Sequence, residues 1–246
     1  MTRFIMGVQP VREAIRADSR GVVRVMVLHR AGAASTTLHA IARFAQDHGV
    51  EVAPVDSSTL DRMARGVAHQ GVIAVASDLQ IVNLDQVVAS EPRTIIALDQ
   101  ISDPQNFGAI IRSAVAFGTD AVLWPEHASA PLTPATFRAS AGAIEHATLC
   151  RVRKLPAAIE QLERTGMLAV GLAGDAADSI ESVNLTQPVV IVVGSEGEGL
   201  RKTVRAACSR LVSLPTHPPV STLNASVAAA VALYEVCRQR RSTASP

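Results

Sequence analysis

The sequence predicts an α/β protein in two parts, a small α/β domain followed by a larger domain with a mostly parallel sheet and helices on both faces. From Thr94 onward, short apolar runs alternate with helical segments, the pattern of a parallel sheet covered by helices. The run Val189–Val193 is apolar at every position, as a strand buried on both faces requires. We therefore expect a small domain over residues 1–78, a linker over 79–93 and the larger domain over 94–246.

Composition narrows the class of protein. The 246-residue chain is 48% hydrophobic and 18% charged, as folded globular proteins are, and its net charge of +1 means that any nucleic-acid site must be a local patch. The three cysteines lie far apart without metal-ligand spacing, which predicts reduced thiols and no metal site. With neither a signal-peptide pattern nor an apolar run of membrane length, we expect a cytoplasmic protein with no membrane partner.

The small domain shows alternating helical and strand-like patterns. We expect helices over Val8–Ala17, Leu38–His48 and Thr59–Ala64, and strands over Val22–Leu28, Val50–Val55 and Gly71–Ala76. From Arg3 to Ser77 there are nine arginines against six acidic residues, so most of the excess positive charge lies here. On charge alone, an RNA-binding face and an ordinary solvated face are equally good interpretations. Residues 78–93 lose the apolar pattern and resemble a connector with a short helix.

The larger domain alternates strand and helix throughout. We expect strands over Thr94–Leu98, Ala121–Trp124, Ala147–Val152, Leu168–Leu172, Val189–Val193 and Leu211–Leu214. We expect helices over Phe107–Phe117, Pro134–Ile144, Pro156–Thr165, Arg201–Cys208 and Ser226–Arg238. The last helix is apolar nearly all round from Val227 to Tyr234, which predicts burial against the sheet or in a subunit interface.

Three polar loops follow strand ends, over residues 99–106, 194–200 and 216–224. Ligands of open α/β sheets bind outside the carboxyl ends of the strands, so we expect these loops to converge. Asn106 stands near a helix start, where asparagine is ordinarily a cap, and Asn224 or Ser226 can cap the last helix. Arg112 lies among apolar residues, where a charge needs a partner such as a phosphate.

The second loop, Gly194-Ser-Glu-Gly-Glu-Gly-Leu200, is rich in glycine but matches neither a P-loop nor the dinucleotide motif. Glu196 and Glu198 would repel a pyrophosphate. An acidic loop lined by backbone suits a cationic ligand such as S-adenosylmethionine, whose sulfonium is positive. A glycine-rich turn with solvated glutamates is the alternative. The histidines form no triad or metal pattern, although His217 could touch a ligand, and no hydrolase motif is present.

Together these loops resemble the three signature motifs of the SpoU (TrmH) family of RNA ribose 2′-O-methyltransferases, in the SPOUT class. The matching segments are Asp103–Arg112, Val193–Gly199 and Leu223–Ala229, in order and each at a strand end. Gly7–Ala14 resembles the opening of the RlmB-like subgroup, and Ala68–Gly71 its substrate-binding domain. The resemblance implies a trefoil-knotted C-terminal sheet, which is a rare exception to the rule against knots. It also implies a ribosomal-protein-like N-terminal domain and a homodimer with sites at the subunit interface.

The resemblance further implies the reaction and the residues that perform it. The cofactor would be S-adenosylmethionine, with no metal, and the product a 2′-O-methylated guanosine in large-subunit (23S) ribosomal RNA. The positions that match the family's catalytic residues are Asn106, Arg112, Glu196, Thr222 and Asn224, with Thr222 standing where the family has serine. The cofactor pocket would be lined, largely through backbone groups, by Gly194, Leu214 and Leu223, with help from Leu172–Gly174.

The role of Arg112 follows from its chemistry. A ribose hydroxyl must lose its proton while it attacks the methyl group. Arginine has been proposed as the base in this family, but a guanidinium is not deprotonated in proteins. We instead expect Arg112 to bind the target's phosphate and to stabilise the developing alkoxide charge.

The third motif departs from the family pattern. Members commonly read Ile-Pro-Met-x-Gly-x-Val where this chain has Leu214-Pro-Thr-His-Pro-Pro-Val220. Pro218 replaces the glycine, so a backbone with positive φ cannot be kept there. Two alternatives therefore stay open: a non-catalytic RNA-binding or ribosome-assembly protein of the same fold, and a methyltransferase acting on transfer RNA or another ribosomal RNA site, including one that confers antibiotic resistance.

Overall fold

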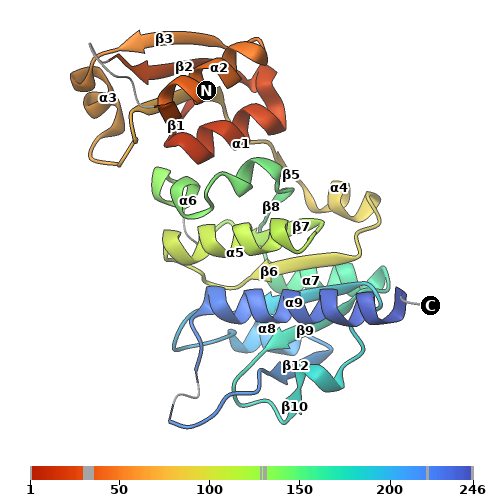
Figure 1. Cartoon of the computed structure of the whole chain (residues 1–246). Coiled ribbons are helices and arrows are strands. Elements are labelled where there is room, and N and C mark those ends of the chain that lie inside the picture. The colour runs from red at the N-terminus through yellow and green to blue at the C-terminus, as the bar shows by residue number, and fades with distance from the viewer. Residues whose placement is uncertain (1, 30–35, 128, 130–131, 220–221, 245–246) are drawn as a thin grey trace. The chain divides into compact units, whose positions relative to one another are not determined.

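The computed structural model describes residues 2–29, 36–127, 129, 132–219 and 222–244. The chain forms two compact units (Figure 1). The first comprises Met1–Gln80 and Leu132–His146, and the second comprises Ile81–Pro131 and Ala147–Pro246. The segment Leu132–His146 is tied to the first unit by Arg3. The two terminal nitrogens of the Arg3 guanidinium donate hydrogen bonds to the two carboxylate oxygens of Glu145, at 2.7 and 2.6 Å.

The first unit is built on a four-stranded sheet of order β1-β4-β2-β3. Its strands are β1 (Thr2–Met6), β2 (Val22–Leu28), β3 (Glu51–Val55) and β4 (Val72–Ser77), and only β2 and β3 pair in parallel. Its helices are α1 (Val8–Asp18), α2 (Thr36–Asp47), α3 (Ser57–Ala64) and α6 (Pro134–Ala139), with short 3-10 turns at Ser19–Gly21 and Ala143–His146. Ile15 of α1 and Ile41 of α2 lie in one apolar cluster, and Leu60 of α3 lies in another, so the sheet carries helices on both faces.

The second unit contains an eight-stranded sheet of order β10-β12-β9-β11-β6-β7-β8-β5, in which every pairing is parallel. Its strands are β5 (Ile81–Val82), β6 (Thr94–Leu98), β7 (Ala121–Pro125), β8 (Leu149–Val152), β9 (Leu168–Leu172), β10 (Asp178–Ser179), β11 (Val189–Val193) and β12 (Arg210–Ser213). The predicted parallel α/β class is confirmed.

Helices cover both faces of this sheet (Figure 1). They are α4 (Leu84–Ala89), α5 (Pro104–Ala116), α7 (Leu155–Arg164), α8 (Lys202–Ala206) and α9 (Ala225–Ala244), with a 3-10 turn at Ile180–Ser182. Alternate residues of the central strands, such as Ile95 and Val190, join one apolar cluster with Ile159 of α7 and Val204 of α8. Helices α5 and α9 pack against each other, and α9 also contacts β11. Because each central strand is buried on both sides, its continuous apolar sequence is explained.

The helix ends differ from the predicted ones for local reasons. Helix α5 begins at Pro104, three residues early, because the Asp103 carboxylate accepts from the N–H groups of Gln105 and Asn106 and caps the first turn. Helix α6 ends at Ala139, five residues early, because Ala141 and Gly142 adopt positive φ values of 50° and 87°. None of the described helices is long and apolar enough to cross a membrane.

Candidate active site

Three loops meet at the carboxyl edge of the eight-stranded sheet, as the sequence predicts. The side-chain amide of Asn106 donates to Oε1 of Glu196 at 2.9 Å. The amide of Asn224 donates to Oδ1 of Asn106 at 2.9 Å and also to Oε1 of Glu196. One residue from each loop therefore belongs to a single hydrogen-bonded group, called here the Asn–Glu–Asn cluster.

The caps of helices α5 and α9 explain why the side-chain amides of Asn106 and Asn224 can reach the cluster. Asp103, and not Asn106, caps α5, so the Asn106 side chain is free to reach Glu196. Asn224 caps α9 through Oδ1, which accepts from the N–H of Ser226 at 2.9 Å, while its amide nitrogen faces the cluster. Glu196 Oε1 is approached by both asparagine amides and by the N–H of Ala225 at 3.4 Å. A carboxylate suits this position because it only accepts hydrogen bonds.

The Gly194–Leu200 loop needs glycine at its first position. A Cβ atom on Gly194 would lie 2.2 Å from the carbonyl carbon of Gly199 and 2.5 Å from the nitrogen of Leu200. The loop closes through two backbone bonds, from Ser195 N to Gly199 O at 3.2 Å and from Gly199 N to Ser195 O at 3.0 Å. This close approach holds Glu196 at the tip of a compact turn.

A buried carboxylate anchors the end of that loop, and the sequence analysis did not single it out. Asp99 is fully buried directly after β6. Its carboxylate accepts from the backbone N–H of Arg201 at 2.9 Å and from the guanidinium Nε at 2.8 Å. The bond joins the first loop to the second across 102 residues of sequence. An acidic residue directly after the apolar run Ile95–Leu98 was the available signal.

A cavity of about 410 Å³ opens beside the Asn–Glu–Asn cluster, within the size range of small-molecule sites. The predicted cofactor residues Gly194, Leu214 and Leu223 all line it, as does Thr222. Its remaining walls include the 172–175 segment and the rest of the glycine loop. The structure thus brings the predicted cofactor residues to one cavity, despite the proline substitution in the third motif.

The charges around this cavity favour a cationic ligand. Glu196 and Glu198 line the cavity. Arg205 also lines it, but it is paired with Asp175 at 2.9 and 3.1 Å, and this pairing lowers the pKa of the Asp175 carboxyl below its ordinary value. An acidic, backbone-lined cavity fits the positive sulfonium of S-adenosylmethionine. A side chain at position 194 would overlap the loop backbone, so this part of the cavity wall can consist only of backbone atoms.

Two predicted residues, Arg112 and His217, belong neither to the Asn–Glu–Asn cluster nor to the lining of the cavity. Arg112 is exposed on α5, and its side chain makes no hydrogen bond or ion pair with any residue that the structure describes. The partner expected for its charge is therefore not found in the described chain, and its guanidinium is open to a ligand. His217 is exposed and does not line the cavity.

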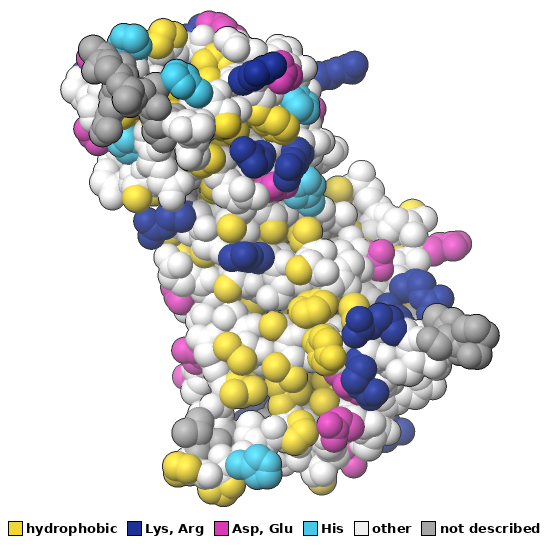
Figure 2. Space-filling model, in the orientation of Figure 1, with side chains coloured by type: hydrophobic (Ala, Val, Ile, Leu, Met, Phe, Trp, Pro, Cys, Tyr) yellow, Lys and Arg dark blue, Asp and Glu magenta, His cyan; other side chains and the backbone are white. Residues whose placement is uncertain are grey.

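Helix α9 is buried on one side and exposed on the other. Ala229, Leu233 and their neighbours pack inward, whereas Val227, Val231 and Tyr234 are 46%, 40% and 48% exposed. The spacing of these three residues places them on one helix face. Hydrophobic side chains gather over α5 and α9 in the space-filling view (Figure 2). Across the described ranges, no group of three or more His, Cys, Asp and Glu side chains could hold a metal ion.

Comparison with known proteins identifies the family. Residues 93–234 match the SpoU rRNA methylase family, and residues 4–82 match the substrate-binding domain of RNA 2′-O ribose methyltransferases. An uncharacterized tRNA/rRNA methyltransferase of Mycolicibacterium vanbaalenii is 38% identical over 98% of this chain and 78% of its own length. The 23S rRNA (guanosine-2′-O-)-methyltransferase RlmB of Vibrio parahaemolyticus is 35% identical over 96% of this chain and 97% of its own.

Solved structures agree with this assignment. The SpoU methyltransferase AviRb from Streptomyces viridochromogenes, in complex with the cofactor AdoMet, has a TM-score of 0.81 and 26% identity, covering 98% of this chain and 91% of its own. The chain belongs to the SpoU rRNA methylase family and is an RNA methyltransferase that uses S-adenosylmethionine.

Proposed function

We propose that the protein transfers the methyl group of S-adenosylmethionine to the 2′-hydroxyl of a guanosine in 23S ribosomal RNA. The observation that carries this proposal is the Asn–Glu–Asn cluster beside an acidic, backbone-lined cavity. The choice of guanosine and of 23S RNA is supported by the 35% identity with RlmB of Vibrio parahaemolyticus, which extends over almost the whole of both chains.

The cofactor would be held in the 410 Å³ cavity, by backbone groups at Gly194, Leu214 and Leu223, with the Thr222 hydroxyl at its wall. When bound, it supplies an electrophilic methyl group on a positively charged sulfur. Glu196 and Glu198 place negative charge around this cavity, which favours a cation over a nucleotide phosphate.

The Asn–Glu–Asn cluster would orient the acceptor ribose. Glu196 Oε1 already takes the donors of Asn106 and Asn224, whereas Oε2 accepts no hydrogen bond from any residue in the described ranges. Oε2 is therefore open to the ribose hydroxyl. Because three loops hold the carboxylate, it is preorganised before RNA binds.

Arg112 would bind a phosphate of the target nucleotide and stabilise the alkoxide charge that develops as the hydroxyl attacks. Its guanidinium is exposed on α5 and has no acidic partner in the described chain, so its donors are available. The planar guanidinium can donate two parallel hydrogen bonds to one phosphate. In this role the side chain stays protonated throughout the reaction.

We further propose that the exposed face of α9 is covered by a second copy of the chain. Val227, Val231 and Tyr234 form an apolar stripe that ends near Leu223, itself 39% exposed and part of the cofactor cavity wall. A second copy covering this stripe would therefore border the cofactor cavity. Val231→Glu should convert a dimer into a monomer in sedimentation analysis, and a wild-type protein that sediments as a monomer would exclude this arrangement.

Pro218 in the third motif makes cofactor binding the property to test first. Calorimetry should show binding of S-adenosylmethionine below millimolar cofactor, and no detectable binding would contradict the proposed reaction.

Mass mapping of ribose methylation in cells lacking the gene tests the target. We expect one guanosine of 23S RNA to lose its methyl group and to regain it on complementation with the wild-type gene but not with Asn106→Ala. Loss of a methyl group from transfer RNA alone would reassign the substrate.

A further inference from the structure

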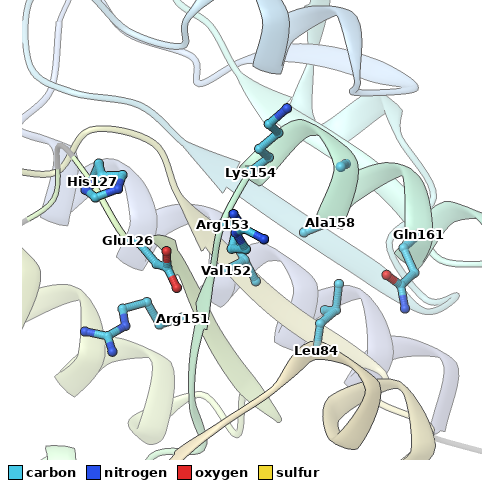
Figure 3. A pocket seen from close by; sticks show the side chains of 10 residues that line it. Leu84, Glu126, His127, Arg151, Val152, Arg153, Lys154, Ala158 and Gln161 are labelled. Atoms are coloured by element: carbon cyan, nitrogen blue, oxygen red, sulfur yellow. The ribbon is translucent and has the colours of Figure 1, made fainter.

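A second cavity, of about 690 Å³, lies at the carboxyl ends of β7 and β8 in the same unit (Figure 3). Three cations of one short segment line it, Arg151, Arg153 and Lys154, and they are called here the basic cradle. Glu126 and His127, which directly follow β7, also line the cavity, and Glu126 is drawn near Arg151 (Figure 3). The cradle thus carries three positive charges against one lining carboxylate.

The cations of the cradle are not used to hold the fold together. All three residues are exposed, and none of their side chains makes a hydrogen bond or an ion pair with another residue in the part of the chain that the structure describes. By contrast, Arg201 and Arg205 are paired with Asp99 and Asp175. Clustered cations of one sign repel one another and gain no stability from the arrangement, so an anionic ligand is the natural partner.

The backbone adds to the same preference. Helix α7 begins at the cradle with Lys154 at its N-cap, and no side chain of the described residues caps this end. The N–H groups of Leu155 and Ala157 lie in the first turn, where no helical carbonyl can accept from them. The positive end of the helix dipole points the same way, so side chains and backbone both favour an anion.

The location of the cradle indicates which anion it binds. All strands of this sheet are parallel, so the ends of β7 and β8 lie on the edge that also carries the Asn–Glu–Asn cluster. Strand β8 is two strands from β6, which corresponds to about 10 Å at about 4.8 Å per strand. At roughly 3.4 Å of helix axis per phosphate, the spacing along one strand of a DNA duplex, this separation corresponds to a few nucleotides.

We propose that the basic cradle binds backbone phosphates of the RNA substrate, a few nucleotides along the strand from the ribose that is methylated. This proposal rests on the proposed function, because it assumes that RNA enters at this edge. The cradle would contribute affinity and register without reading the base sequence, since phosphate contacts carry no sequence information. It would be separate from the cofactor cavity, with which it shares no lining residue.

The test removes two charges from the cradle and two from elsewhere. Arg151→Gln/Arg153→Gln is compared with Arg164→Gln/Arg210→Gln in the full chain. Arg164 ends α7 and Arg210 begins β12, so both are at the amino edge of the same sheet, and both are exposed. Binding of 23S RNA is measured by filter retention from 50 to 300 mM KCl, and cofactor binding by calorimetry.

We expect the cradle variant to bind 23S RNA on the order of tenfold more weakly at 100 mM KCl and the slope of log K against log salt to become shallower by about 1.4, at about 0.7 per phosphate contact. Cofactor binding and the melting temperature should be unchanged, and the control variant should bind RNA much as the wild type does. Equal RNA affinity and slope in the two variants would overturn the proposal.

Two further outcomes would distinguish an acidic protein partner from RNA, and a failure of the proposed methyl transfer from a failure of the cradle proposal. If the cradle variant loses binding of a dodecaglutamate peptide while RNA binding is unchanged, the surface serves an acidic protein and the RNA proposal is wrong. If the wild type binds no cofactor but its RNA binding still depends on the cradle, methyl transfer is excluded while the cradle stands.

Discussion

The cofactor cavity and the basic cradle lie on the same edge of one parallel sheet, yet their walls are opposite in character. The cofactor cavity is lined by glycine backbone, two glutamates and an arginine that is already paired. The cradle is lined by the start of a helix and by three cations that have no acidic partner among the described residues. A chain with a net charge of only +1 can therefore have two separate sites on one edge of the sheet, one suited to a cationic cofactor and one suited to a polyanionic RNA.

The same comparison explains why rigidity differs between the two sites. The cofactor cavity depends on backbone atoms in fixed positions, so Gly194, Asp99 and the helix caps hold its loops tightly. The cradle depends on long exposed side chains that can adjust to a flexible strand. Small steric changes should therefore damage the first site, and only changes of charge should affect the second.

The largest effect is expected for Gly194→Ala. Its Cβ would lie 2.2 Å from the Gly199 carbonyl carbon, so the loop backbone must move. At about 1–3 kcal/mol for such overpacking, cofactor affinity in calorimetry should fall on the order of 10- to 100-fold, while 23S RNA binding through the cradle persists. Gly174→Ala is the matched control, because it lines the same cavity and its Cβ would have no atom within 4 Å. Equal cofactor affinity in the two variants would contradict the steric argument.

A smaller effect, on turnover alone, is expected for Arg112→Lys. Like the cradle cations, Arg112 has no acidic partner within the described ranges. It would nevertheless act on the reacting nucleotide and not on distant phosphates. Lysine keeps the charge and loses the forked donors, so kcat should fall about tenfold or more with cofactor affinity unchanged. The Arg151→Gln/Arg153→Gln variant should show the reverse, with KM raised and kcat kept. Full turnover by Arg112→Lys would show that a forked contact is not needed.

The sequence predicts much of this fold because apolar runs define the central strands. Strands β6, β9 and β11 have the predicted bounds, since each is apolar along nearly its whole length. Strands β5 and β10 have only two residues each and exist through their neighbours, so no local pattern could reveal them. Helix α6 likewise ends early because Ala141 adopts a positive φ, and an alanine in the sequence gives no sign of such a backbone conformation.

For the site, the sequence predicts residue types better than their partners. The loops at strand ends predict where the site lies, and the resemblance to the SpoU family indicates Asn106, Glu196 and Asn224 within them; the structure joins these three side chains by hydrogen bonds. The bond between Asp99 and Arg201 spans 102 residues and depends on a tertiary approach that no motif records. The cradle was missed for a different reason: Arg151, Arg153 and Lys154 resemble an ordinary polar strand end, and only the structure shows that they lack acidic partners among the described residues.

A modest gain is expected when the cradle's lining acid is removed. Glu126→Gln would raise the net charge of the lining side chains by one, so 23S RNA should bind about two- to fivefold more tightly at 100 mM KCl, in keeping with about 1 kcal/mol for a charge pair in water. Glu160→Gln, on an exposed position of α7 that does not line the cavity, is the control. If both variants bound 23S RNA more tightly, the gain would come from the net charge of the protein alone and not from the cradle.

The smallest effect is expected at the rim of the cofactor cavity. Hydrogen bonds from Arg205 hold the pKa of the Asp175 carboxyl below its ordinary value of 3.8. A lowered pKa in the folded state means that the pair contributes fully above pH 3.8 and is lost only as pH falls through the lowered value. This pair should therefore introduce no change in cofactor affinity between pH 5 and 8.

Removing the ion pair between Asp175 and Arg205 should also change cofactor affinity little at neutral pH. Asp175→Asn should weaken cofactor binding at pH 7 by no more than about threefold, as an exposed ion pair implies. Arg205→Gln should match it, and the double variant should be no worse than either single one, because the two side chains act together. A loss of a hundredfold in Asp175→Asn alone would instead mean that this carboxylate contacts the cofactor directly, and the acidic character of the cavity would then extend to its rim.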